Sequence, residues 1–222
     1  MDFEPFFKEY RLLVEKVDDA FRRVQQEYGD CVLCKEACSD CCNALFDLTL
    51  IEAVYIKENF DRMFTGDRRE QLIERANRAD RDICRIKKVA VQALEKGKPE
   101  DEILEDMALK RVRCPALDEN NLCAIYEVRP ITCRLYGIPT EIGGRAHSCG
   151  ISGFKEGVAY PTVKLDAIYQ RLYEISTALA QGVESRYSKL ADMLVPLSMA
   201  LLTDYTEDYL GVKLKDRSTE EK

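Results

Sequence analysis

The chain of 222 residues is 46% hydrophobic and 33% charged, with a formal net charge of −7. A chain of this length can bury a hydrophobic core without cross-links, and the composition excludes disordered, collagen-like and membrane-spanning proteins. The basic residues are scattered along the chain instead of forming a stripe, so we expect neither nucleic acid nor a membrane as a partner. The unusual feature of the composition is the presence of ten cysteines.

The N-terminal segment predicts where these thiols reside. Residues 1–4 are acidic and lack the basic region and apolar stretch of a secretion signal. We therefore expect a cytoplasmic protein with reduced thiols. In a reducing compartment, clustered cysteines are more often metal ligands or redox groups than disulfides.

Hydrophobic periodicity predicts a mainly α fold. Apolar side chains recur every three or four positions over residues 3–28, which is typical of an amphipathic helix packed on its own core, with coiled-coil pairing as the alternative. Thr49 and Glu52 form a capping-box pattern at the start of a second helix. The predicted central helices cover residues 49–60, 67–96 and 99–109, and the third helix of the chain is expected to bury one face from Leu72 to Leu94.

The rest of the chain predicts a loop-rich segment and two more helices. The helical period disappears over residues 111–162, where prolines and glycines are frequent, and it resumes within 163–210. Pro196 must kink or restart the last helix. We therefore expect one domain over residues 1–212, a helical bundle with an irregular cysteine-rich metal-binding loop region at one end. A charged tail follows over residues 213–222.

Nine of the ten cysteines fall into two banks. The first bank lies within residues 31–42, and the second is spread through the irregular segment. Cys84 stands alone beside core-facing Ile83, where we expect a small buried hydrophobic side chain. Cys31 and Cys84 are thus the two that we expect not to bind metal.

The spacing of the first bank bears on the number of metal sites. Eleven residues of helix span about 16 Å, so these thiolates cannot converge from one straight helix on a single ion at about 2.3 Å. Either the segment turns sharply around one site or its members serve two sites, and the adjacent pair Cys41 and Cys42 favours two. The eight expected ligands, two sets of four, are Cys34, Cys38, Cys41, Cys42, Cys114, Cys123, Cys133 and Cys149.

The residue types leave the metal open, since thiolates bind zinc, iron–sulfur clusters and copper(I) alike. Residues 110–149 carry six basic and four acidic side chains, a locally positive segment in an acidic protein. Arg129 and Arg134 can donate hydrogen bonds to ligand sulfurs or hold a substrate carboxylate or phosphate. The single histidine, His147, is expected to be solvated, which disfavours general-base catalysis.

Two motifs resemble the CxxCxxCC, or YkgJ, cysteine-cluster family. The first is CKEACSDCC over residues 34–42, followed by Glu52-Ala53, although the spacing from Cys34 to Cys38 is four where the family motif has three. The second contains CPAL from Cys114 and CAIYEVRPITCRLY over residues 123–136, and it is similar to the pattern CPxL…CxIYxxRPxxCRxY. The resemblance covers about residues 31–150.

The resemblance implies a zinc- or iron-chelating protein. The family also includes flagellin lysine N-methylases, which use S-adenosylmethionine together with an iron–sulfur cluster; this chain shows no glycine-rich nucleotide motif. In such an enzyme Tyr126, Arg129, Arg134 and Tyr136 would line the cofactor pocket. We expect instead that these tyrosines pack around the metal site and that the arginines neutralise it.

We therefore expect a metalloprotein that binds one or two iron–sulfur (4Fe–4S) clusters, or zinc or iron ions, with a redox or metal-handling role. The first alternative is the cluster-dependent lysine N-methylase. The second is a structural zinc module that presents its helices to a protein partner. A thiol redox sensor is the last alternative, because it needs an exposed cysteine of low pKa.

Overall fold

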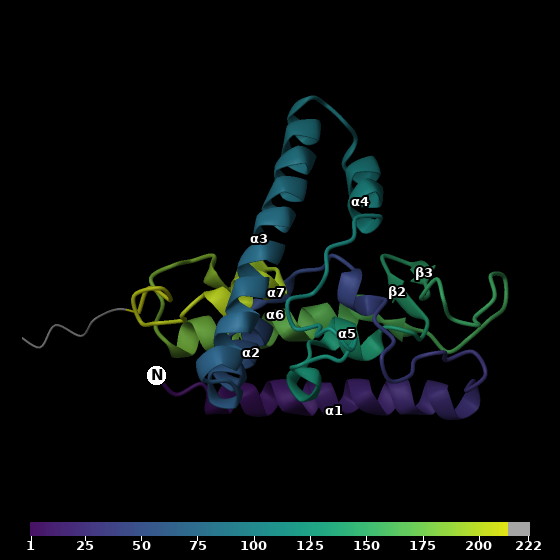
Figure 1. The fold of residues 1–222 in the computed structure, drawn as a ribbon, viewed down its shortest axis with the longest axis horizontal. Coiled ribbons are helices and arrows are strands. Elements are labelled where there is room, and N and C mark those ends of the chain that lie inside the picture. Colours follow the sequence, from purple (N-terminus) through teal and green to yellow (C-terminus); the bar gives the residue numbers. More distant parts are fainter. Residues whose placement is uncertain (213–222) are drawn as a thin grey trace, which may run out of the picture.

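A computed structural model describes residues 1–212, and its main elements are helices (Figure 1). This confirms the predicted mainly α fold; the expected charged tail at 213–222 lies outside the described residues. None of the helices in the described part is long and apolar enough to cross a membrane. The helices are α1 (Glu4–Glu27), α2 (Leu50–Met63), α3 (Gly66–Glu95), α4 (Glu100–Ala108), α5 (Ile131–Leu135), α6 (Leu165–Gly182) and α7 (Leu197–Leu202).

The first two helices form where the sequence predicts them. Helix α1 buries its apolar stripe, including Phe7, Tyr10 and Val17, and ends two residues before Gly29. Helix α2 begins with the expected capping box. The Thr49 side chain accepts the backbone N–H of Glu52, and the Glu52 carboxylate accepts the backbone N–H of Thr49. Local signals in the sequence therefore account for the buried face of α1 and for the start of α2.

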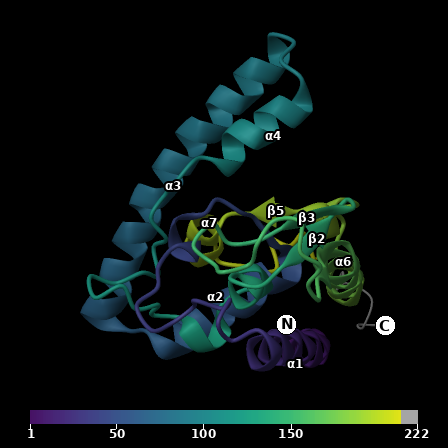
Figure 2. The same ribbon diagram turned by 90° about the vertical axis from the view of Figure 1, so that its right-hand side faces the viewer.

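Helices α3 and α4 form a hairpin that projects from the body of the protein (Figures 1 and 2). The buried residues of α3 are Leu72, Ala76, Ala79 and Ile83. Beyond Ile83 the helix leaves the body, and Leu94 is exposed. The prediction that α3 buries one face as far as Leu94 is therefore wrong, because the second half of the helix lacks a body to pack on.

Cys84 lies at the point where α3 leaves the body. Its side chain is exposed, and its sulfur is 3.8 Å from the Asp80 carboxylate on the preceding turn of the same helix. The prediction of a buried Cys84 is wrong for the same reason as that for Leu94. Neighbouring positions on a helix point about 100° apart, so burial of Ile83 does not extend to the next side chain.

Small sheets connect the segments around the helices. Strand β1 (Leu48–Thr49) pairs antiparallel with β5 (Leu194–Val195). Strand β2 (Thr140–Ile142) pairs antiparallel with β3 (Arg145–His147) and parallel with β4 (Val163–Lys164). The segment expected to be loop-rich therefore contains α5 and a three-stranded sheet as well as turns.

The second of the two C-terminal helices is shorter than predicted. Residues 190–202 form a 3-10 turn (Leu190–Asp192), strand β5 and the six-residue helix α7. Pro196 is the N-cap of α7. Proline lacks an N–H and disfavours helix at the residue before it, so the apolar period that runs through Pro196 is divided between a strand and a helix.

Candidate metal centre

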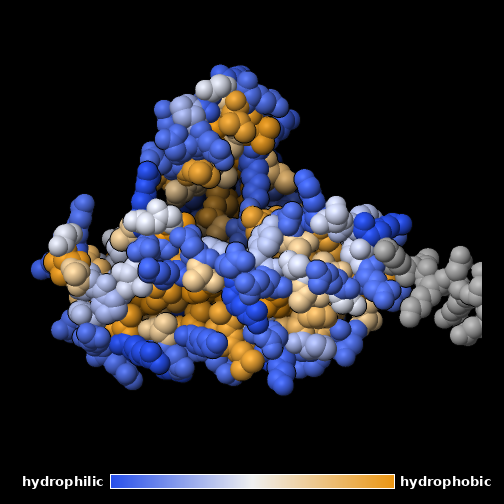
Figure 3. All heavy atoms as spheres, turned by 180° about the vertical axis from the view of Figure 1, so that it is seen from behind, coloured by the Kyte–Doolittle hydropathy of each residue, from blue (hydrophilic) through white to orange (hydrophobic). Residues whose placement is uncertain are grey.

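All eight cysteines that the sequence analysis selects line one cavity. The cavity has a volume of about 730 Å³ and lies between α1, α3, α7 and the two cysteine-bearing segments, not at one end of the bundle as expected. Figure 3 shows a hollow with hydrophobic walls at the base of the α3–α4 hairpin. The thiols on its wall, each half-buried, belong to Cys34, Cys38, Cys41, Cys42, Cys114, Cys123, Cys133 and Cys149.

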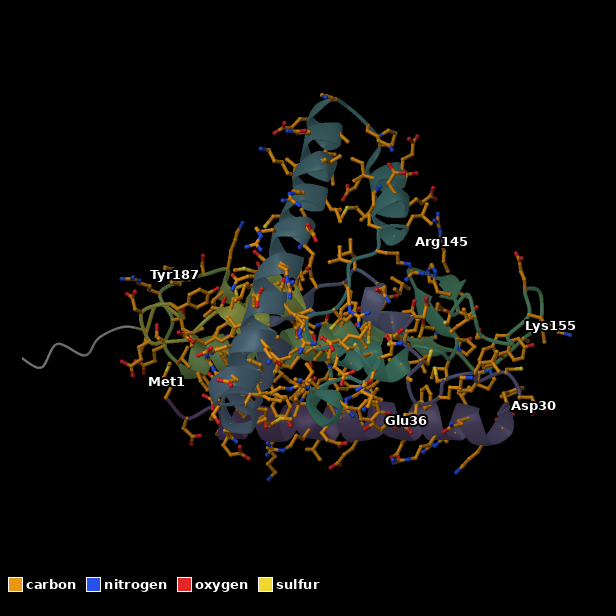
Figure 4. All side chains as sticks on the ribbon, viewed as in Figure 1. Met1, Asp30, Glu36, Arg145, Lys155 and Tyr187 are labelled. Carbon is orange, nitrogen blue, oxygen red and sulfur yellow. The ribbon has the colours of Figure 1, made fainter. Side chains whose placement is uncertain are left out.

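Cys31 and Cys84 are not part of the cavity wall. The backbone carbonyl of Cys31 accepts a hydrogen bond of 2.8 Å from Gly153 N–H. In Figure 4, Asp30 and Lys155 lie near the C-terminal end of α1. Glu36, which lines the cavity, lies further from that end. The cavity wall thus contains the eight cysteines that the sequence suggests as ligands and neither of the other two.

The first cysteine bank is a turn, not a straight helix. Cys38 N–H donates to Lys35 O at 3.0 Å, and Ala37 between them has a φ of +63°. The chain then forms a 3-10 turn over Cys41–Asn43. Through this reversal Cys34 and Cys42 both reach the wall of the same cavity.

Backbone hydrogen bonds attach the second bank to the first. Cys114 N–H donates to Cys42 O at 2.7 Å, and Val112 N–H donates to Asn43 O at 3.1 Å. Cys123 returns beside Cys114 because Leu117 and Cys123 form an antiparallel bridge. The Asp118 carboxylate closes the intervening turn by accepting the N–H of Asn120 at 2.9 Å and of Leu122 at 2.8 Å.

Arg134 holds the segment that carries Cys133 against α1. Its side chain is buried, and its Nη1 donates to the Asp18 carboxylate of α1 at 2.8 Å. Its Nε donates to Arg129 O at 3.0 Å, and its Nη2 donates to Glu127 O. The guanidinium thus bonds three protein acceptors, which favours the structural role for Arg134 over the binding of a cofactor.

Asp40, between Cys38 and Cys41, joins three other parts of the wall. Its Oδ2 accepts the hydroxyl of Tyr136 at 3.0 Å and lies 3.7 Å from the Cys149 sulfur. Its Oδ1 lies 3.6 Å from the guanidinium of Arg111. The Tyr136 hydroxyl is therefore also engaged by the protein, consistent with a role in packing around the site.

Arg129 is a cation of the cavity wall whose charge acts on a cavity thiol. Its guanidinium lies over the ring of Tyr126, 3.8 Å from the centroid, and both side chains line the cavity. Burial raises the pKa of Cys123, and the Arg129 charge partly offsets this rise. The arginine therefore stabilises thiolate at the wall of the cavity.

Burial makes most of these thiols weak acids in the metal-free protein. Burial, followed by the charges of neighbouring thiolates, raises the pKa of Cys34 to about 11 and that of Cys114 to about 12. Cys41 is the exception, because a hydrogen bond from Cys42, 3.9 Å away between sulfurs, lowers its pKa to about 7. A set of thiolates in this cavity requires cations, and metal binding supplies them while releasing protons.

The thiols surround the cavity without closing on one point. Among residues 1–212, no group of three or more histidine, cysteine, aspartate or glutamate side chains is arranged to hold a metal ion as it stands. The donor set nevertheless fits metal binding chemically, since soft thiolates select zinc and iron–sulfur clusters. His147, exposed on β3, takes no part in the cavity wall.

Sequence reasoning missed three acidic residues that position the site: Asp18, Asp40 and Glu52. Asp40 carried a signal in its place between two cysteines, and Glu52 carried one as a capping-box residue. Asp18 carried none, because its partner Arg134 is 116 positions away in the sequence.

Comparison with known proteins agrees with this geometry. The model of the CxxCxxCC family, described as "Putative zinc- or iron-chelating domain", matches residues 33–150, more than half of the chain and all eight cavity cysteines. No curated protein and no solved structure matches the chain. The chain belongs to the CxxCxxCC family.

Proposed function

We propose that this protein is an iron–sulfur protein that transfers electrons, with the cluster or clusters bound by the eight cavity cysteines. The observation that carries the proposal is the convergence of eight thiols from two distant segments on one cavity of about 730 Å³. Thiolate-bound iron–sulfur clusters exchange single electrons, and hydrogen bonds and solvent exposure tune their potentials.

The size of the cavity supports clusters over single ions. Four sulfurs that bind one zinc ion at about 2.3 Å lie about 3.8 Å from one another. An ion held in this way occupies only a small part of the cavity that the eight thiols surround. A cubane cluster places inorganic sulfide and iron between the protein ligands, so it suits thiols arranged around a wider space.

The other side chains of the wall support a redox role over acid–base catalysis. Arg129 supplies positive charge beside the sulfurs, and Tyr126 stacks on it at the exposed rim. The only histidine of the chain lies outside the wall. The wall therefore offers thiols, a charge-compensating arginine and a solvent-exposed rim at which an electron-transfer partner can approach.

The lysine N-methylase alternative needs free polar groups to hold S-adenosylmethionine. Of the four residues assigned to such a pocket, Arg134 and Tyr136 are bonded to Asp18 and Asp40, and Arg129 is stacked on Tyr126. These contacts favour electron transfer over methyl transfer. The structural zinc module shares the ligands and differs in the metal, so the metal decides between it and the electron-transfer proposal.

The test is metal analysis of protein purified without oxygen. We expect iron and acid-labile sulfide, a brown colour and an EPR signal after reduction. A variant lacking both Cys31 and Cys84 is the matched control, and it should keep the full iron content because neither residue lines the cavity. Colourless protein with stoichiometric zinc and no reversible reduction would overturn the proposal in favour of the structural zinc module.

A further inference from the structure

We propose that the α3–α4 hairpin is the site at which two copies of this chain form a dimer. The α3 arm of the hairpin is residues 84–98, the part of α3 beyond Ile83 with the turn that follows it, and the α4 arm is residues 99–109. A two-fold axis places the α4 arm of each copy on the α3 arm of the other, so that the same contact is formed twice. The inference concerns a surface away from the cysteines and does not depend on the proposed function.

Both arms expose large hydrophobic side chains. Single exposed hydrophobic residues are ordinary on a protein surface, whereas a group of them on one projecting element is typical of an interaction site. Figure 3 shows hydrophobic atoms near the tip of the hairpin. The side chains are between 53% and 79% exposed, and they belong to Val89, Val91, Leu94, Leu104 and Leu109.

The packing between the two helices leaves these side chains uncovered. Helix α4 packs on α3, and within α4 Ile103 is buried and Met107 is half-buried. Figure 2 shows both arms projecting beyond the body of the protein. In a single copy of residues 1–212 the exposed side chains therefore stay in contact with water, and docking of another molecule gains free energy by covering them.

The two arms carry opposite charges. The α3 arm contains five basic side chains and one acidic side chain, a net charge of +4. The α4 arm contains five acidic side chains and no basic one, a net charge of −5. The hairpin therefore presents a positive strip and a negative strip beside its exposed hydrophobic side chains.

Few of these charges are paired within one copy. Among residues 1–212, the ion pair of Lys98 with Asp106 is the only one within the hairpin that joins the two arms. Lys87 pairs with Asp47 of the body, and Arg85 pairs within its own helix. The charged side chains of the arms that form no ion pair with another residue of 1–212 are Lys88, Glu95, Lys96, Glu100, Asp101, Glu102 and Glu105.

The presence of both signs favours a second copy as the partner. A partner surface of one sign complements one arm and repels the other, because like charges across an interface are unfavourable. A second hairpin with its α4 arm on the α3 arm brings −5 against +4 on each side of the two-fold axis. Contact of α4 with α4 would instead bring ten carboxylates together.

The contact is short, and this sets the behaviour that we expect. The helical part of the α3 arm, residues 84–95, is about 18 Å long. An interface of this length depends on charge attraction as well as on hydrophobic burial. We therefore expect a dimer that dissociates on dilution and at high ionic strength, because salt screens exposed charges.

The first test is the molar mass of the full chain, measured by sedimentation equilibrium over a range of protein concentrations. We expect a dimer at low salt and a shift toward monomer at about 0.5 M salt. Leu94→Ser with Leu104→Ser should be monomeric. Leu12→Ser removes an exposed leucine of α1 and is the matched control, which should dimerise like the unsubstituted protein. Circular dichroism reports whether each variant keeps its helices.

Charge reversal tests the pairing of α3 with α4. Lys88→Glu with Lys96→Glu makes the α3 arm negative, and Glu102→Lys with Glu105→Lys weakens the negative charge of the α4 arm. Each double variant alone should be monomeric, whereas an equimolar mixture of the two should form a mixed dimer, because each reversed arm then meets an arm of opposite charge.

Three results would overturn the proposal. They are a monomer at every concentration of the unsubstituted protein, a dimer that survives the leucine substitutions, and a mixture of the two charge variants that stays monomeric. The metal content of the same samples should be equal in all variants, since no residue of the arms lines the cavity. Zinc in place of iron would overturn the electron-transfer proposal and leave dimerisation unchanged.

Discussion

The carboxylate of Glu52 caps two helices at once, through its bonds to Thr49 and to Ile131. Its Oε2 accepts the N–H and the hydroxyl of Thr49 at 3.1 and 3.0 Å, at the start of α2. Its Oε1 accepts the N–H of Ile131, the first residue of α5, at 3.1 Å. Cys133 lies two residues further along α5, so a buried residue of α2 fixes the position of a proposed metal ligand.

Replacement of Glu52 by glutamine should destabilise the metal-free protein. The side-chain amide has one accepting atom and one donating atom, so it cannot accept hydrogen bonds from the first turns of both α2 and α5. An unsatisfied buried N–H costs about 1–3 kcal/mol. Urea unfolding measures this loss, and metal content should fall with it because α5 carries Cys133.

The control for this substitution is Glu58→Gln in the same helix. Glu58 forms an exposed ion pair with Arg62, a kind of pair that contributes only about 0.3–0.5 kcal/mol. Equal stability of Glu52→Gln and the unsubstituted protein would show that Glu52 is not needed for both caps.

The pair of Arg134 and Asp18 should behave as a coupled unit. Lysine in place of Arg134 has a single nitrogen and cannot bond Asp18, Arg129 O and Glu127 O together. We expect Arg134→Lys to lower the free energy of unfolding by about 2 kcal/mol, the order of a hydrogen bond to a charged group. Urea unfolding of the apo-protein measures the change.

A double-mutant cycle checks whether the contact itself is responsible. Asp18→Asn in the Arg134→Lys background should cost less than Asp18→Asn alone, since the contact is then already lost. Arg145→Lys, an exposed change on β3, is the control and should leave stability unchanged. Strictly additive effects on the free energy of unfolding would show that the contact between Arg134 and Asp18 does not hold α5 against α1.

The metal-free protein should lose stability in alkaline solution. Burial raises the pKa of Cys34 to about 11 and of Cys114 to about 12 in the folded state, whereas an unfolded thiol has a pKa of about 8.5. Between these values the unfolded chain binds fewer protons than the folded chain. The contribution of these thiols to the free energy of unfolding is therefore complete below about pH 8.5 and is lost as the pH rises toward 12.

Urea unfolding of apo-protein at pH 7, 9 and 10.5 measures this loss. Tyr136, which is half-buried, acts in the same direction, since burial also raises its pKa to about 12. The variant Cys34→Ala with Cys114→Ala separates the two contributions, because its stability should fall less steeply. Equal slopes for the two proteins would show that Cys34 and Cys114 do not contribute to the pH dependence.

Gly137 should be essential for the position of Cys34. Its φ is +103°, and a Cβ at this position would lie 2.2 Å from the Cys34 sulfur. Gly137→Ala therefore has to displace the sulfur as well as strain the backbone. We expect it to lower the metal content, measured as metal equivalents per protein.

Gly97→Ala is the matched control for backbone strain. Gly97 has a φ of +84° at the tip of the α3–α4 hairpin, and nothing lies within 4 Å of the added Cβ. It should cost about 1 kcal/mol of stability, as for an alanine forced to positive φ, without loss of metal. A full metal content in Gly137→Ala would show that the contact with Cys34 is unimportant for binding.

The sequence by itself determined most of the helices and grouped the cysteines that line the cavity. Amphipathic periodicity and the capping box at Thr49 are local signals, and they placed α1 and α2 within a few residues of their observed ends. The cysteine motifs separated eight residues from Cys31 and Cys84, and these eight line the cavity. Local spacing is sufficient for both, because helix formation and motif identity depend on neighbours along the chain.

Only the tertiary structure decided how these residues meet. The exposure of Cys84 depends on where α3 leaves the body, and the burial of Arg134 depends on Asp18 in a distant helix. The convergence of Cys34 and Cys149 on Tyr136 and Asp40 joins segments more than a hundred residues apart. Contacts of this kind arise from the packing of whole helices, and the spacing of residues along the chain does not contain them.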